Sequence, residues 1–153
     1  MAKSGPSVLF VNIPSRPLTE IENAIRGEGL FDSFQDDVTM PMGILYLASY
    51  IRTYAPVSRV ALADYALRIA QGRTFGSVER YIDAALEELD FTPDIVGFTL
   101  NFTPAQPFFD LCLERFRRRF PQARILAGGN HATNTFTYQL QNPNLDAVCV
   151  GEG

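Results

Sequence analysis

The sequence predicts an α/β protein whose doubly wound sheet has five parallel strands in the order 2-1-3-4-5. Apolar runs of strand length recur along the 153 residues, and amphipathic segments of helix length separate them. Strands joined through helices pair in parallel by right-handed crossovers. The central runs also lack a clean alternation of apolar and polar residues, which is typical of strands covered on both faces. Ligands of such sheets bind beyond the carboxyl ends of the strands, where the strand order reverses.

Five apolar runs are predicted as strands, because each is short and rich in residues that favour a pleated, buried surface. They are 7–13 (SVLFVNI), 58–64 (SRVALAD), 94–99 (DIVGFT), 123–129 (ARILAGG) and 146–150 (DAVCV). Their order makes the fold flavodoxin-like, a Rossmann-like arrangement, with the reversal between the first and third strands.

Amphipathic spacing predicts the helices. The segment 43–54 places Ile44, Leu47, Ala48 and Ile51 on one stripe, and 77–90 places Val78, Ile82, Ala85 and Leu89 on its inner face. A third helix covers 105–120, with Pro107 tolerated in its first turn. A short fourth helix is predicted within 132–142.

The connection 15–40 is long for a strand-to-helix loop, because most such loops have about 2–6 residues. Its segment TEIENAIR predicts a helical turn or two. A long loop at the ligand-binding edge is either a lid or docking surface, or a tolerated surface excursion. Both interpretations stay open at the level of sequence.

Composition narrows the class of protein. The net charge is −4, which argues against a nucleic-acid or anionic-membrane partner. The run RFRRRF (115–120) is better explained by a buried pair, Phe116 and Phe120, and by arginines that complement a helix carboxyl end. With no signal-peptide pattern and no membrane-spanning run, we expect a cytoplasmic protein. Cys112 and Cys149 stand in apolar segments and are predicted to be buried and reduced.

Several kinds of site are excluded by missing motifs. The loop after the first strand, NIPSRP, has neither GxGxxG nor GxxxxGK[ST], and Thr99 stands where a phosphoacceptor aspartate would end the third strand. The single histidine, His131, has no marked nucleophile beside it in the sequence, and an all-protein zinc site lacks ligands.

Small and hydroxyl-bearing residues remain at the predicted carboxyl edge, in GFTLNFTP, AGGNHAT and VGEG. Hydroxyls there can donate or accept hydrogen bonds. Glycines let a large flat ligand approach the backbone, and amides after Gly129 could bind an anion. Taken alone, the Gly128–Gly129 pair is better explained by a tight strand-to-helix turn.

The stretches PMGILYLASYIR, DIVGFT, ILAGGNHATN and DAVCVGEG together carry a resemblance. The chain resembles the N-terminal cobalamin (B12)-binding domain of B12-dependent radical SAM proteins, over roughly residues 8–153, with the weakest match in 15–40. Related cobalamin modules have the motifs DxHxxG, SxL and GG. Thr99 and Asn101 fall on SxL, and Gly128 and Gly129 fall on GG.

The resemblance implies roles for these residues. Thr99 would meet the dimethylbenzimidazole base, and the glycines would make room for the nucleotide tail. The predicted cofactor-binding residues are Asn12, Pro14, Pro41, Gly43, Asp64, Thr99, Asn101, Thr103, Gly128, Gly129, Asn130, His131, Thr133, Gly151 and Glu152. No catalytic residue is predicted.

One motif departs from the family. Where DxHxxG would stand, the chain reads DYALRI, so Asp64 matches but Ala66 replaces the histidine and Ile69 the glycine. Alanine cannot ligate cobalt. The radical SAM branch commonly lacks this histidine too, and His131 is a poor substitute because it follows the fourth strand. No protein ligand to the metal is therefore predicted.

Family members continue into a catalytic barrel with CxxxCxxC, which is not present here. The resemblance thus implies that 1–153 is one excised cobalamin-binding domain without its last helix. Its partner would be a downstream radical SAM domain that holds a [4Fe–4S] cluster and S-adenosylmethionine, often for methyl transfer.

Two expectations follow from the missing helix. The sheet face under 43–54 would be partly uncovered, so the domain would self-associate, and it would hold cobalamin weakly or not at all.

The alternative to a cobalamin-binding module is a degenerate module. Such a domain keeps the fold, binds no corrin and serves as an interaction or scaffold domain.

Overall fold

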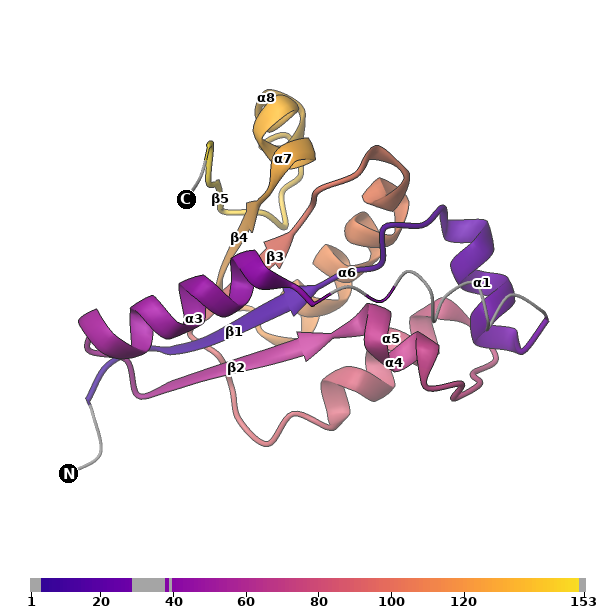
Figure 1. Cartoon of the computed structure of the whole chain (residues 1–153), viewed down its shortest axis with the longest axis horizontal. Coiled ribbons are helices and arrows are strands. Elements are labelled where there is room, and N and C mark those ends of the chain that lie inside the picture. Colours follow the sequence, from indigo (N-terminus) through magenta and orange to yellow (C-terminus); the bar gives the residue numbers. More distant parts are fainter. Residues whose placement is uncertain (1–3, 29–37, 39, 152–153) are drawn as a thin grey trace.

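The computed structural model describes residues 4–28, 38 and 40–151, and every structural statement below concerns these residues. Five strands form one all-parallel sheet in the order β2-β1-β3-β4-β5, which confirms the predicted topology (Figure 1). The strands are β1 (Ser7–Asn12), β2 (Arg59–Asp64), β3 (Ile95–Thr99), β4 (Arg124–Gly128) and β5 (Ala147–Val148). The last strand is shorter than predicted, because only Ala147 and Val148 pair with β4.

The helices are α1 (Leu18–Arg26), α3 (Met42–Tyr54), α4 (Tyr65–Ala70), α5 (Val78–Glu87), α6 (Gln106–Arg119), α7 (Asn130–Asn134) and α8 (Phe136–Gln139). A 3-10 turn, Thr103–Ala105, leads into α6. The predicted helices in 43–54, 77–90 and 105–120 are confirmed, and α1 confirms the helical turns expected in the long loop. The fourth predicted helix is divided at Thr135 into α7 and α8. The sequence analysis missed α4.

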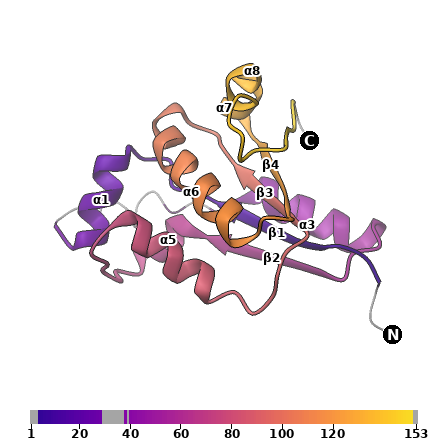
Figure 2. The ribbon, with the colours of Figure 1, turned by 180° about the vertical axis from the view of Figure 1, so that it is seen from behind.

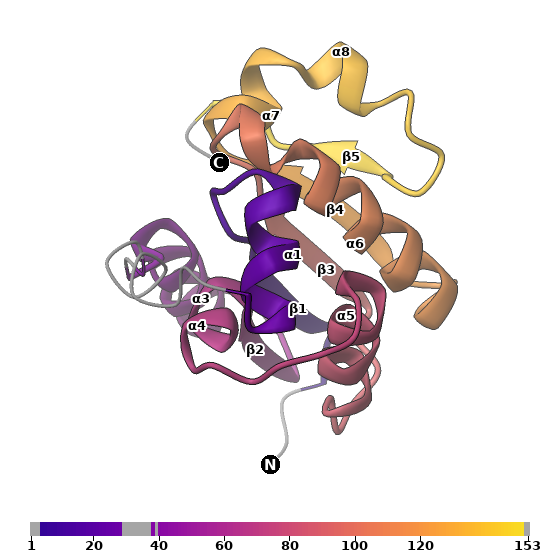
Figure 3. The same cartoon turned by 90° about the vertical axis from the view of Figure 1, so that its right-hand side faces the viewer.

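Right-handed crossovers place the helices on two faces, as expected. Figure 1 shows α3 lying across β1 and β2 on one face, and Figure 2 shows α5 and α6 on the other. In Figure 3, which looks onto the carboxyl ends of the strands, α1 lies in front of the sheet beside α5 and α4. Helices therefore lie on both faces of the sheet, as the predicted doubly wound fold requires.

The main core lies between the sheet and α1, α5 and α6, and it is rich in aromatic rings. Phe98 of β3 packs edge-on against Phe116 of α6, with ring centroids 4.9 Å apart. Phe116 and Phe120 are both buried, as the RFRRRF run predicted. Each buried ring contributes about 1.5–3 kcal/mol through the water it excludes.

A smaller cluster lies under α3 and joins it to β1 and β2. Of the predicted α3 stripe, Ile44 is fully buried and Ala48 and Ile51 pack partly against the cluster. Leu47 is 39% exposed, so its predicted burial is wrong. Because α3 lies over β1 and β2, its flank toward β3 has less to pack against.

The two faces of β3 and β4 differ in burial. Val96, Phe98, Ile125 and Ala127 point toward α5 and α6 and are buried, whereas their alternating neighbours are half-buried or exposed. The expectation that both faces are covered is therefore wrong for this half of the sheet. Cys149, just after β5, lies on this open face and is exposed, so its predicted burial is wrong. Cys112 in α6 is buried as predicted, and both cysteines are free thiols.

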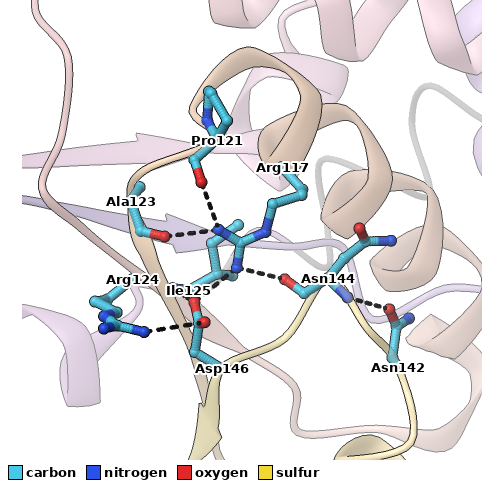
Figure 4. A network of polar contacts seen from close by, with 8 residues as sticks. All are labelled: Arg117, Pro121, Ala123, Arg124, Ile125, Asn142, Asn144 and Asp146. Atoms are coloured by element: carbon cyan, nitrogen blue, oxygen red, sulfur yellow. Dashed lines mark hydrogen bonds and ion pairs between the residues drawn. The ribbon is translucent and has the colours of Figure 1, made fainter.

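A polar network fixes the amino-terminal edge of β4 and β5 (Figure 4). The Arg117 guanidinium donates to the Ala123 carbonyl at 2.8 Å and pairs with Asp146 at 2.6 Å. The Ile125 amide donates to the same Asp146 carboxylate at 2.7 Å. Burial alone would raise the pKa of Asp146, but the Ile125 amide and Arg117 hold it below its ordinary value. The arginine run thus joins α6 to the sheet.

Candidate functional site

Four predicted site residues lie in one row across the carboxyl ends of neighbouring strands. Asn12 pairs in register with Asp64 of β2 and with Thr99 of β3, and Thr99 pairs with Gly128 of β4. Residues paired in a parallel sheet point to the same face. The row therefore lies on the face that α3 covers only in part.

Hydrogen bonds run along this row. The Asn12 amide nitrogen donates to Asp64 Oδ1 at 3.1 Å, which turns the Asn12 carbonyl oxygen toward Thr99. Thr99 Oγ1 lies 3.1 Å from that oxygen and donates its proton to it. A hydroxyl has one proton and two lone pairs. In this arrangement Thr99 keeps acceptor capacity for a ligand, whereas its donor is already used by Asn12.

The two glycines of the GG pair have different surroundings. A Cβ at Gly128 would meet one described atom within 4 Å, the Cys149 Cβ at 3.5 Å, which is an ordinary contact. Gly129 has φ +105°, and a Cβ there would collide with Asn101 Oδ1 and lie 2.9 Å from the Leu100 carbonyl oxygen. Gly129 is thus required by the turn itself, while the missing side chain of Gly128 leaves space over the sheet.

The amides after Gly129 are not available to an anion, so that expectation is wrong. Those of His131 and Ala132 both donate to the Leu100 carbonyl at 3.1 Å, and that of Asn130 donates to Asn101 Oδ1 at 3.3 Å. Asn101 and Asn130 therefore join the β3 loop to the β4 loop. These contacts explain why the chain needs a glycine at 129.

His131 is held between Thr103 and Gln106. Its Nδ1 lies 3.2 Å from Thr103 Oγ1, and its Nε2 lies 3.2 Å from Gln106 Oε1. Since Gln106 Oε1 can only accept, Nε2 carries the proton, and in the neutral ring Nδ1 accepts from Thr103. Both ring nitrogens have protein partners in this structure. Thr103 and His131 form a separate cluster from the row at Thr99.

Two glutamines complete this cluster, and the sequence analysis missed them. Gln139 is buried, and its amide nitrogen donates to Gln106 Oε1 at 2.6 Å and to Thr135 Oγ1 at 3.0 Å. The Gln106 amide donates in turn to Asp110 at 3.0 Å. A glutamine in the polar segment TYQLQN has no local signal of burial, because its partner on α6 is 33 residues away.

Asp64 also begins α4. Its side chain accepts the Leu67 amide at 3.0 Å, so the first residue of DYALRI is a helix N-cap. Ala66 follows in the first turn and is half-buried, and Ile69 is buried in the main core. A short helix therefore stands where the resemblance suggests a histidine-bearing loop.

A groove of about 690 Å³ runs beside Asp64 along the outer edge of β2. Its apolar lining includes Pro41, Leu45, Leu62 and Leu67, and the charged Glu88 and Arg68 also line it. Hydrogen bonds from Arg68 and Arg73 lower the pKa of Glu88 to about 2. Two predicted residues, Pro41 and Asp64, line this groove.

The remaining predicted residues are spread around the carboxyl edge. Pro14 is buried after β1, and Gly43 is exposed in the first turn of α3, with open space where a Cβ would stand. Thr133 Oγ1 accepts the Gly151 amide at 3.1 Å, which holds the segment after β5 against α7. Glu152 lies outside the described residues.

Comparison with known proteins adds no family. No protein-family model matches the chain, and no curated protein matches it.

Across the described residues, no group of three or more His, Cys, Asp or Glu side chains could hold a metal ion. In the same part of the chain, every helix is too short or too polar to cross a membrane.

Proposed function

We propose that this chain is a cobalamin-binding module and that the nucleotide tail of the cofactor lies over β3 and β4, beside α3. The observation that supports this most directly is the space over Gly128, where a side chain could stand against Cys149 alone. The half-buried residues around it on the same face include the small Thr99 and Ala147, with Leu126 as the one larger apolar neighbour in β4. A flat tail needs such a surface.

The residues of the row would receive the cofactor. Thr99 has lone pairs to accept from an amide of the corrin periphery, and Asp64 and Asn12 keep the Thr99 hydroxyl in a fixed orientation. Gly43 leaves the first turn of α3 open beside this face. When bound, the cobalt would be the reactive centre. The protein would hold and orient the cofactor and set the polarity around it.

No protein ligand to cobalt is part of this proposal. Ala66 has no donor atom, and both nitrogens of His131 contact Thr103 and Gln106. The resemblance favours a parent enzyme of the B12-dependent radical SAM class, with methyl transfer as the usual reaction. Its downstream domain would be the partner of this module.

A second candidate is a module that keeps the fold and binds no corrin. Two observations favour it: the turn geometry alone explains Gly129, and the amides that follow are already paired. Such a domain would act through its surface. Cobalamin retention separates the two candidates.

The test is incubation of the purified chain with hydroxocobalamin, removal of free cofactor by desalting, and an absorption spectrum. We expect the wild type to retain corrin and Gly128→Leu to lose it while keeping its circular dichroism spectrum. Gly76→Leu is the matched control, because Gly76 also has open space around its Cβ position but lies in the loop before α5. No retention by the wild type, or equal retention by the folded Gly128→Leu variant, would contradict the proposal.

A further inference from the structure

The outer face of α3 has the composition of an interface. The helix Met42–Tyr54 contains one charged residue, Arg52, whose guanidinium donates to the Val60 carbonyl of the edge strand at 2.9 Å. A helix that faces water normally carries charged side chains opposite its buried stripe. Here that position is occupied by three tyrosines.

Tyr46, Tyr50 and Tyr54 follow one another at four-residue spacing, so they form a stripe along the helix. Their exposed fractions are 71%, 64% and 73%. The rings of Tyr50 and Tyr54 contact each other, with centroids 4.8 Å apart. We call these three residues the tyrosine stripe. Figure 1 shows α3 standing in front of the sheet, with no labelled helix over it.

The stripe supplies about half of the surface that a stable dimer buries on each partner. A tyrosine contributes about 150–250 Å² when it becomes fully buried, so three rings at these exposed fractions offer roughly 300–500 Å². A stable interface buries about 800 Å² on each partner, a little over half of it apolar. Met42 and Leu47, also exposed, lie on the same helix and extend the apolar surface.

The spacing also fits a two-fold axis. When two copies of α3 pack antiparallel with Tyr50 at the axis, Tyr50 meets its own counterpart, and Tyr46 meets Tyr54 of the other copy. A surface that matches itself in this way forms a closed, isologous interface. Because the stripe has no charge, a second copy meets no like-charge repulsion there, despite the net charge of −4.

We propose that the chain forms a symmetric homodimer through the tyrosine stripe of α3, with Tyr50 at the two-fold axis. Aromatic residues at the centre of an interface carry most of its binding energy. The tyrosine stripe shares no residue with the row at Thr99, so the dimer contact does not require bound cofactor.

Sedimentation equilibrium of the full chain without cobalamin tests this proposal. We expect a concentration-dependent mass that approaches twice the monomer mass of 17.0 kDa. Tyr50→Glu, which places two carboxylates at the axis, should weaken the dimer by about thirtyfold or more. Tyr138→Glu is the matched control, since Tyr138 is also an exposed helical tyrosine, on α8, and should leave the dimer unchanged.

Charge complementation tests whether Tyr50 lies at the two-fold axis. Tyr50→Glu and Tyr50→Lys should each be monomeric alone, and an equimolar mixture should regain a heterodimer. Circular dichroism shows whether each variant is folded, which we expect because the ring is mostly exposed. A wild type that stays monomeric at all concentrations overturns the homodimer. A dimer that persists in Tyr50→Glu, or variants that do not recombine, overturns the assigned axis.

Discussion

At the scale of the residue, neighbouring glycines have unequal roles. Gly128 ends β4 with φ in the ordinary range and free space at its Cβ position, whereas Gly129 has φ +105° and contacts the β3 loop closely. Residues that carry a side chain rarely adopt such a positive φ. The turn depends on Gly129, whereas the proposed cobalamin tail would lie over Gly128.

Substitution by alanine should therefore separate the pair. We expect Gly129→Ala to lower the free energy of unfolding by about 1–3 kcal/mol, through backbone strain and the collision with Asn101. Gly128→Ala should change it by less than about 0.5 kcal/mol. Urea unfolding followed by circular dichroism measures both. Equal effects of the two substitutions would show that the turn tolerates a side chain at 129.

At the scale of the element, α4 shows how a very short helix is held in place. Six residues are too few for a stable isolated helix, so contacts to other elements must hold it. Asp64 caps its amino end, Tyr65 and Ile69 are buried, and Arg68 makes two hydrogen bonds to Glu88, at 2.6 and 3.1 Å. Arg73 adds a third bond to the same carboxylate at 2.9 Å.

The Glu88 carboxylate should make stability depend on pH. Its pKa is lowered from 4.5 to about 2 in the folded chain, because Arg68 and Arg73 hydrogen-bond its charged form. The stabilisation is therefore complete above about pH 4.5 and is lost as the pH falls toward 2. Since Glu88 is largely exposed, Glu88→Gln should cost at most about 1 kcal/mol at neutral pH.

Urea unfolding at neutral and acidic pH measures this effect. The difference between wild type and Glu88→Gln should shrink as the pH falls through this range. Glu87→Gln is the control, because Glu87 is an exposed neighbour at the end of the same helix. A Glu88→Gln difference that is independent of pH would contradict a role for the charged form.

At the scale of the whole molecule, the two faces of the sheet differ. Toward α5 and α6 lies a continuous core of aromatic and aliphatic side chains, while the other face has a small cluster under α3 and an open strip over β3 and β4. The two thiols report on this difference. Cys112 is fully buried within the core, and Cys149 is exposed beside Gly128.

Thiol labelling should therefore proceed in two steps. Cys149 should react with an alkylating reagent at close to the rate of a free thiol, whereas Cys112 should react only when the core opens globally. Burial also raises the pKa of Cys112, which lowers its reactive thiolate fraction. Mass spectrometry of timed samples follows both sites, and Cys149→Ser should remove the fast step alone. Similar rates at both cysteines would contradict this packing.

The strands, their order and the three long helices could be predicted from the sequence, because apolar spacing is a local pattern and right-handed crossovers follow from chain connectivity. The sequence also predicted that Asp64, Asn12, Thr99 and Gly128 gather at one edge, since the carboxyl ends of parallel strands must meet. Which polar groups already have partners within the protein could be seen only in the three-dimensional arrangement of the chain. Thr99 donates to Asn12, 87 residues away, and the amides after Gly129 bond to the β3 loop. The exposure of Leu47 and Cys149 likewise depends on where α3 lies over the sheet, and contacts so distant in sequence leave no local pattern.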